Sequence, residues 1–256
     1  MRINRSLARQ RAGGITIGPG IVYDSADLVE QVAHMGFDWI WLDWQHGQFT
    51  EHTLNNALAR FLHLDSAPIV RVKGNEPGTI NRVLDMGALG VIVPMVQNAE
   101  QAAAAVEATF YPPKGRRSAG GVRLGLIGGS FDQYCAEAND QIMLVVMVET
   151  EEAVANVREI MAAPGVDVVL IGPGDLMIDV KARGHDQARH EQLALEVAAA
   201  SKASGTAAGY VCNSVEIAER RIAQGFRFIN YGLDHFALLE GFGAIRAQAQ
   251  RWSSAR

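Results

Sequence analysis

Short runs of β-branched and apolar residues recur along the chain, and they alternate with stretches whose apolar residues repeat at helical spacing. Runs of this kind are typical of strands buried on both faces, and each one is followed by a candidate helix. The pattern therefore indicates repeated βα units with a parallel sheet. The expected strands are Ile15 to Val22, Trp39 to Trp44, Pro68 to Val72, Gly90 to Val96, Leu144 to Glu149, Asp167 to Ile171, Thr206 to Val211 and Phe226 to Tyr231.

Capping residues mark the ends of several expected helices. Asp24 with Ser25, Thr50 with Glu51, and the Glu76-Pro77 pair can each begin a helix, because side-chain oxygens cap free N–H groups and proline needs no hydrogen bond there. Glycines follow other helices, where we expect left-handed C-caps. These glycines are Gly36, Gly87, Gly165, Gly205 and Gly225.

Eight βα units in a chain of 256 residues, with no change in composition that would mark a linker, predict one closed (β/α)₈ TIM barrel spanning residues 1–256. A doubly wound open sheet is the alternative. It is less favoured, because neither a G-x-G-x-x-G nor a G-x-x-x-x-G-K-[ST] pattern follows any of the strands.

Composition and charge exclude several other classes of protein. The net charge of −5 and the absence of a dense basic stretch argue against nucleic-acid binding. The longest apolar run, Ile142 to Val148, is too short to cross a membrane, and no apolar segment of the kind found in secretory signals follows the arginine-rich N-terminus. The only cysteines, Cys135 and Cys212, match no metal or redox spacing, so we expect a cytoplasmic protein.

One segment, Phe110 to Asp140, is longer, richer in glycine and more basic than a connection requires. A mobile surface loop is one interpretation of it. The segment leaves the far end of a helix, so only a fold-back or a neighbouring subunit could bring Arg116, Arg117 or Arg123 to the mouth of the barrel.

Catalytic groups of TIM barrels lie at the carboxyl ends of the strands, and two carboxylates fall there. Glu149 ends an apolar strand whose Val145 and Met147 share its face, and Asp175 follows the next strand. Adjacent parallel strands are about 4.8 Å apart, so both side chains can converge on one hard cation, Mg²⁺ or Mn²⁺. Alternatively, each carboxylate simply caps a helix or turn.

The end of the second strand, WLDWQHG, offers a candidate base. His46 follows Asp43 by three residues, and a carboxylate bound to one ring nitrogen would leave the other free to accept a proton. The remaining histidines are expected on helices or in loops, where solvated or structural roles are usual.

Further groups suited to anions lie at the same face. Arg71 can pair with a carboxylate or stabilise an enolate oxygen, although a salt bridge to Glu149 or Asp85 is the simpler alternative. Glycines in the IGPGD turn, Gly172-Pro173-Gly174, let backbone N–H groups approach an anion. Together these parts suit a small anionic carbonyl compound that loses a proton, or breaks a C–C bond, alpha to its carbonyl.

Six motifs in one order give the chain a family resemblance from about residue 14 to residue 240. The sequence resembles the class II pyruvate aldolases of the HpcH/HpaI family, which implies a metal-dependent enzyme that cleaves 4-hydroxy-2-oxo acids into pyruvate and an aldehyde, or joins them. It also implies a homo-oligomer, a trimer or a hexamer, with the last helix exchanged between subunits. The motifs are DWIWLDWQHG, PIVRV with GNEP, VIVPMVQNAEQA, YPPKGRR, VETEEAVANV and GVDVVLIGPGDL.

The resemblance also implies a role for each matching residue. Glu149 and Asp175 would hold Mg²⁺, Mn²⁺ or Co²⁺, and Arg71 would stabilise the pyruvate enolate. The remaining roles are a base dyad of His46 with Asp43, binding of the pyruvate carboxylate by the Gly174 and Asp175 amides, and a position near a subunit contact for Asp85.

The chain departs from the family pattern at several positions. Gln45 replaces the usual glutamate before the catalytic histidine, Trp44 replaces a small residue, and Met147 replaces a glutamine before the metal glutamate. The segment after YPP also differs, with GRRSAGG in place of GIRGVG. Gln45 and Met147 therefore leave open an altered barrel that binds a 2-oxo acid without turnover. A Schiff-base lyase is a further alternative, because Lys73 shares strand parity with Arg71 and that neighbouring cation could activate it.

Overall fold

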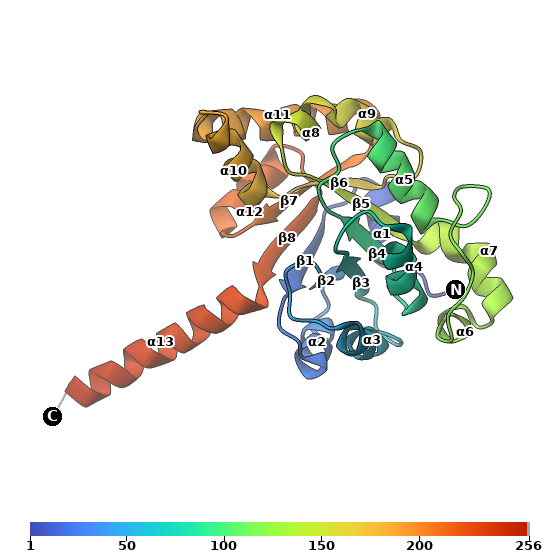
Figure 1. Cartoon of the computed structure of the whole chain (residues 1–256). Helices are drawn as coiled ribbons and strands as arrows, with labels where there is room; N and C mark the ends of the chain where they lie inside the picture. Colours follow the sequence, from blue (N-terminus) through green and yellow to red (C-terminus); the bar gives the residue numbers. More distant parts are fainter. Residues whose placement is uncertain (255–256) are drawn as a thin grey trace.

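Eight parallel strands close into a barrel in chain order, with β1 paired to both β2 and β8. The computed structural model describes residues 1–254, and Figure 1 shows the helices arranged outside the strands. The predicted (β/α)₈ barrel is confirmed, and the open doubly wound sheet is wrong. The strands are β1 (Thr16–Ile21), β2 (Trp39–Asp43), β3 (Ala67–Arg71), β4 (Gly90–Val93), β5 (Met143–Val148), β6 (Val168–Ile171), β7 (Ala207–Cys212) and β8 (Phe228–Leu233).

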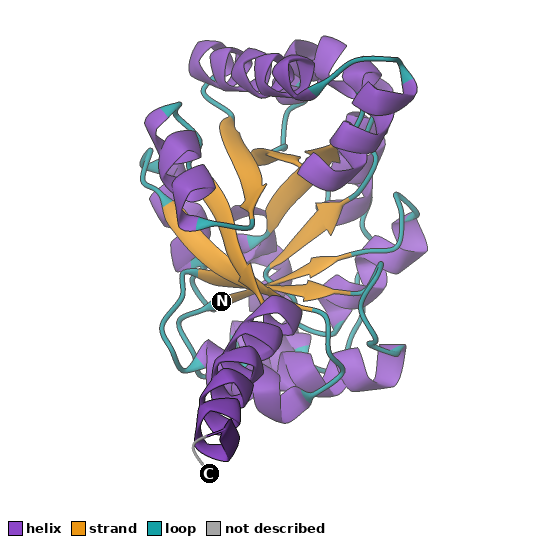
Figure 2. Ribbon diagram, turned by 90° about the vertical axis from the view of Figure 1, so that its left-hand side faces the viewer, coloured by secondary structure: helices purple, strands orange, loops and turns teal. Residues whose placement is uncertain are grey.

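Helices follow every strand and surround the barrel, as Figure 2 shows from a second direction. The predicted caps are confirmed at Ser25, Thr50 and Pro77, and all five predicted C-terminal glycines have positive φ. The helices are α1 (Arg5–Arg11), α2 (Ala26–Ala33), α3 (Glu51–Ala59), α4 (Pro77–Asp85), α5 (Ala99–Thr109), α6 (Leu124–Gly128), α7 (Phe131–Gln141), α8 (Glu151–Ala155), α9 (Val157–Ala162), α10 (Pro173–Ala182), α11 (Gln187–Ser204), α12 (Val215–Ala223) and α13 (Asp234–Ser254).

Every predicted strand exists, and the differences lie at the ends. β4 stops at Val93, three residues earlier than expected, because Pro94 has no N–H to continue the ladder and Met95 takes a positive φ of 56°. β8 begins at Phe228 and ends at Leu233, two residues later at each end than predicted. Strand ends are the part of such a prediction that tertiary hydrogen bonding decides.

Two apolar layers stabilise the barrel. One lies between the strands and the surrounding helices, and the other fills the barrel interior. Val145 and Met147 lie in the interior layer, which confirms the face predicted for β5. Leu7 of α1 joins the same layer, so the first helix adds a buried apolar side chain to it.

The Phe110 to Asp140 segment is not a simple mobile loop, because it contains α6 and most of α7. Its Arg117 is buried and pairs with Asp85 at 2.9 Å, and it also donates to the Tyr134 hydroxyl at 3.1 Å. Asp85 is the last residue of α4, so this pair lies toward the end of the barrel opposite the carboxyl ends of the strands. Within one subunit, Arg117 therefore anchors the segment away from the mouth of the barrel.

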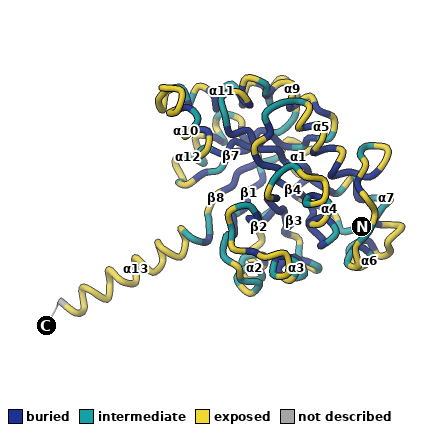
Figure 3. Tube along the Cα trace, viewed as in Figure 1, coloured by how far each residue is buried: buried dark blue, intermediate teal, exposed yellow. Residues whose placement is uncertain are grey.

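The last helix, α13, projects away from the barrel, and almost all of it is exposed to solvent (Figure 3). Its exposed side chains include Phe236, Leu239, Phe242 and Ile245. No helix among residues 1–254 combines the length and apolar character that a membrane crossing requires.

The buried position of Leu7 makes a stability prediction. Leu7 is 1% exposed within the interior layer of the barrel. We expect Leu7→Ala to lower the free energy of unfolding by about 2 to 5 kcal/mol, because truncation loses apolar burial and leaves a cavity. Urea unfolding followed by circular dichroism measures the change.

Ile3, four residues earlier, is 64% exposed and provides the matched control. Ile3→Ala should change the free energy of unfolding by no more than about 0.5 kcal/mol. Equal effects of the two substitutions would show that Leu7 does not contribute to the barrel core in solution.

Candidate active site at the strand ends

The register of the strands brings the predicted site residues to one end of the barrel. Asp43 and Arg71 are the last residues of β2 and β3, and they lie directly opposite each other in the ladder. Val148 of β5 lies opposite Ile171 of β6, so Glu149 and Gly172 leave their strands at the same level. Asp175 follows in the first turn of α10.

Arg71 and Asp43 form a two-point ion pair. Arg71 Nε donates to Asp43 Oδ1 at 2.9 Å, and its Nη2 donates to Oδ2 at 2.6 Å. Both residues are buried, and the guanidinium lies 4.5 Å from the centre of the Trp41 ring. Since bidentate pairing fixes a guanidinium in plane and position, Arg71 is held at the mouth in one orientation. The alternative pairing of Arg71 with Glu149 or Asp85 is not the one formed.

Asp43 does not bind the imidazole of His46. Its Oδ1 instead accepts the backbone N–H groups of Gln45 and His46, at 3.1 and 3.2 Å, in addition to the bond from Arg71. Within residues 1–254 the ring of His46 has no hydrogen bond and is exposed to solvent. Asp43 therefore orients the turn that carries His46, whereas the expected contact between carboxylate and ring is absent. The predicted contact between Asp43 and the imidazole is not formed, and the side-chain partner of Asp43 is Arg71.

Glu149 is a buried carboxylate at the end of β5, only 2% exposed. Its Oε2 accepts the N–H of Met95 at 2.8 Å, and the positive φ of Met95 lies in a region that side chains other than glycine rarely adopt. Its Oε1 lies against Gly172, where a Cβ atom would be 2.4 Å away. The site therefore requires glycine at position 172 to accommodate this carboxylate.

The electrostatics of Glu149 link it to the other site residues. Burial raises the pKa of Glu149 to about 7, and the nearby carboxyl of Asp175 acts in the same direction. The Met95 N–H and the charge of Arg71 oppose that rise. A cation bound between the two carboxylates would stabilise the charged form of Glu149.

The residues present fit a hard divalent cation. One carboxylate is buried and the other, Asp175, is exposed at the mouth, so a bound ion would keep positions open toward solvent. Across residues 1–254 there is no group of three or more His, Cys, Asp and Glu side chains that could hold a metal. Two oxygen ligands suit Mg²⁺ or Mn²⁺, which commonly bind through one or two carboxylates and complete their coordination with water or substrate.

The turn that begins α10 presents free backbone donors beside these carboxylates. Gly172 is the N-cap of α10, Pro173 occupies its first position, and no side chain caps the helix. Gly174 has open space where a side chain would be. Uncapped N–H groups at a helix start attract anions, so this turn can hold a carboxylate of a substrate.

Some features of the site carried no signal in the sequence. The backbone N–H of Met95 donates to Glu149. The positive φ of Met95 is the feature that distinguishes this residue, and the sequence does not reveal it. The ammonium group of Lys73 lies over the ring of Trp44, 4.6 Å from its centre. Trp44, which replaces a small residue of the family pattern, therefore packs against Lys73.

Comparisons with known proteins agree with this geometry. A 4-hydroxy-2-oxovalerate aldolase of Novosphingobium aromaticivorans is 35% identical, with 94% of this chain and 92% of the relative covered. A 4-hydroxy-2-oxo-heptane-1,7-dioate aldolase of Escherichia coli is 36% identical, with coverage of 96% and 94%. Among solved structures, an HpcH/HpaI aldolase/citrate lyase family protein of Burkholderia cenocepacia J2315 is 29% identical and superposes with a TM-score of 0.90, covering 96% of this chain and 99% of that one.

The family model described as HpcH/HpaI aldolase/citrate lyase matches residues 21–240. This range begins at the end of β1 and extends into α13, and it includes every candidate site residue. Together with the aldolase relatives, it shows that the chain belongs to the HpcH/HpaI aldolase/citrate lyase family.

Proposed function

We propose that the protein is a metal-dependent aldolase that cleaves 4-hydroxy-2-oxo acids to pyruvate and an aldehyde, or joins the two. The observation that carries the proposal is the buried Glu149 carboxylate beside Asp175, with the fixed guanidinium of Arg71 near it. Relatives named as aldolases of 4-hydroxy-2-oxo acids support the same substrate class.

Glu149 and Asp175 would hold the cation, which we propose to be Mg²⁺ or Mn²⁺, with Co²⁺ as a further option. When bound, the ion polarises the carbonyl of the substrate as a Lewis acid. The uncapped N–H groups of Gly174 and Asp175 would hold the carboxylate of the 2-oxo acid.

His46 and Arg71 have separate roles in cleaving the bond between C3 and C4. His46 accepts the proton of the hydroxyl group on C4, directly or through water, as its exposed ring permits. The bond between C3 and C4 breaks, the C4 carbon leaves as the aldehyde, and the electron pair moves onto the pyruvate fragment. Arg71 stabilises the negative charge that develops on the keto oxygen, because Asp43 already holds its guanidinium in place.

The two other hypotheses are less consistent with the site. An amine nucleophile needs a desolvated or otherwise activated lysine, whereas Lys73 is exposed beside Trp44. The binding-only hypothesis rested on Gln45 and Met147, but Met147 is part of the apolar interior. Gln45 leaves its buried Oε1 without a partner among the described residues, and it remains a departure that the fold does not explain.

We also propose that the protein is a homo-oligomer, a trimer or a hexamer, in which α13 packs on a neighbouring subunit. Leu239, Phe242 and Ile245 of α13 are each 60% or more exposed. An apolar groove of about 500 Å³ lies at the base of the helix, between α2 and the end of β8, and could receive the helix of another copy.

Both cysteines are free thiols, which is consistent with the cytoplasm.

Exchange of the pyruvate methyl protons with D₂O tests the proposed chemistry without a choice of aldehyde. We expect NMR-detected exchange with Mg²⁺ or Mn²⁺ and none with EDTA, because proton loss requires the negative charge on the keto oxygen to be stabilised. Glu149→Gln should slow the exchange by about 100-fold or more, since it removes a charged ligand at constant size.

Lys73→Met is the control for the Schiff-base alternative and should leave exchange within about threefold of the wild type. Exchange that survives EDTA and disappears in Lys73→Met would contradict the metal-dependent mechanism. Pyruvate binding by calorimetry with no exchange under any condition would favour the binding-only hypothesis.

His46 is expected to act on the hydroxyl of C4 rather than on the methyl group of pyruvate. His46→Ala should therefore reduce kcat for cleavage of a 4-hydroxy-2-oxo acid by about 100-fold or more, the usual size of a general-base contribution. Metal-dependent methyl exchange should fall much less. An unchanged cleavage rate in steady-state assays would remove His46 from the mechanism.

The proposed packing of α13 predicts a change in oligomeric state. Phe242→Glu places a charge on the exposed apolar face and should shift the protein to a smaller species in size-exclusion chromatography with light scattering. Gln248→Glu adds the same charge to the same helix without removing an apolar group, and it should leave the mass unchanged. An unaltered mass in Phe242→Glu would contradict this role of the helix.

A further inference from the structure

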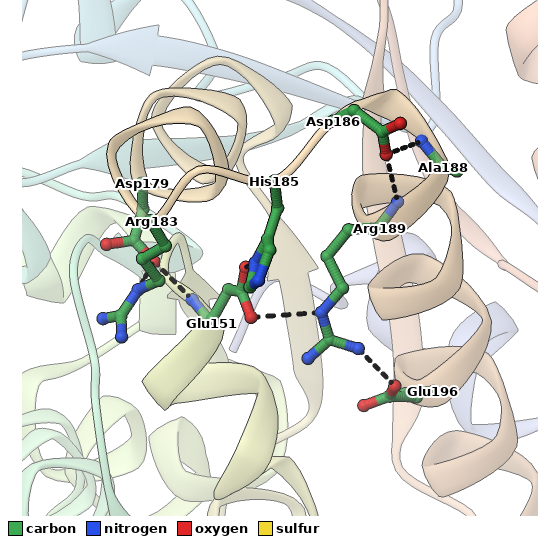
Figure 4. A network of polar contacts seen from close by, with 8 residues as sticks. All are labelled: Glu151, Asp179, Arg183, His185, Asp186, Ala188, Arg189 and Glu196. Carbon is green, nitrogen blue, oxygen red and sulfur yellow. Dashed lines mark hydrogen bonds and ion pairs between the residues drawn. The ribbon is translucent and has the colours of Figure 1, made fainter.

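A network of charged side chains lies beside the two metal-binding segments and has no part in the proposed chemistry (Figure 4). It joins three elements: the start of α8, the middle of α10, and the turn leading into α11. Its members are Glu151, Asp179, Arg183, His185, Arg189 and Glu196.

Asp179 connects the backbone after Glu149 to the helix that carries Asp175. Its Oδ2 accepts the N–H of Glu151 at 2.8 Å, and Glu151 lies two residues after Glu149. Asp179 is itself one helical turn after Asp175 in α10, so the two side chains lie on the same side of that helix. Arg183, a further turn along, donates to the same Oδ2 at 2.9 Å and holds the carboxylate in place.

The side chain of Glu151 fixes the same segment from a second direction. Its Oε1 is 2.6 Å from His185 Nδ1, and its Oε2 accepts from Arg189 Nε at 3.1 Å. Arg189 also donates to Glu196 within α11. The segment after Glu149 is therefore bound to α10 through its backbone and to the start of α11 through its side chain.

Capping of α8 alone does not explain this arrangement. Thr150 already caps that helix, since its Oγ1 accepts the N–H of Ala153 at 3.1 Å. The bond from Asp179 comes from a helix 28 residues further along the chain. Its distinct effect is to fix the position of one ligand-bearing segment relative to the other.

We propose that Asp179 is a positioning residue that sets the relative placement of the Glu149 and Asp175 carboxylates, acting through the backbone N–H of Glu151. The proposal rests on the proposed function, because it assumes that these two carboxylates bind the cation. Partners outside the ligand set commonly change metal affinity by about 10- to 100-fold. Asp179 affects affinity in this way without touching the ion.

Titration of the full-length protein with Mn²⁺, followed by electron paramagnetic resonance of the free ion, tests this role. We expect Asp179→Ala to raise the Kd for Mn²⁺ by about tenfold or more. Asp179→Asn keeps an oxygen that can accept the Glu151 N–H, so its Kd should stay within about threefold of the wild type. Glu149→Gln should abolish binding.

Ser25→Ala is the matched control, because Ser25 caps α2 by accepting the N–H of Leu28, and α2 carries no site residue. It should lower Tm to a similar extent as Asp179→Ala, with an unchanged Kd. An unchanged Kd in folded Asp179→Ala, with loss of binding in Glu149→Gln, would overturn the positioning role and leave the metal site standing. A wild type that does not bind Mn²⁺, or a Glu149→Gln variant that does, would overturn both.

Discussion

The closed ladder of parallel strands determines where the chemistry can lie, because it fixes the height of each strand end relative to its neighbours. Asp43 and Arg71 meet because their strands pair residue by residue, and Glu149 meets Gly172 for the same reason. A shift of one residue in either pairing would turn these side chains toward the outer helices. The apolar interior layer that fills the barrel therefore also sets the geometry of the polar site above it.

The cost of burying charge at the mouth depends on the partners of each charged group. Arg71 and Asp43 satisfy each other through two hydrogen bonds, and the remaining capacity of Asp43 is taken by backbone amides. Burial, together with the neighbouring carboxyl of Asp175, raises the pKa of Glu149 to about 7, and the single backbone donor, the N–H of Met95, only partly opposes that rise. Among residues 1–254 Glu149 forms no ion pair, so a divalent cation bound there would supply its counterion.

Much of the fold and part of the site could be predicted from the sequence. All eight strands follow from the alternation of apolar runs and helical periodicity, and the strand ends direct attention to Arg71, Glu149 and Asp175. The pairing of Asp43 with Arg71 could not be predicted, because it depends on the register of β2 against β3. The bond from Asp179 to Glu151 depends on the relative position of two helices, which periodicity does not specify.

The site has a rigid half and an open half, and this division matches the two substrates of an aldolase. Arg71 and Glu149 are buried and held by hydrogen bonds, so the groups that we propose to act on the 2-oxo acid have little freedom. His46 and Lys73 are exposed at the rim, where the aldehyde would enter. A fixed pocket for the common substrate and an open rim for the variable one would let related enzymes change aldehyde while they keep the barrel and its charges.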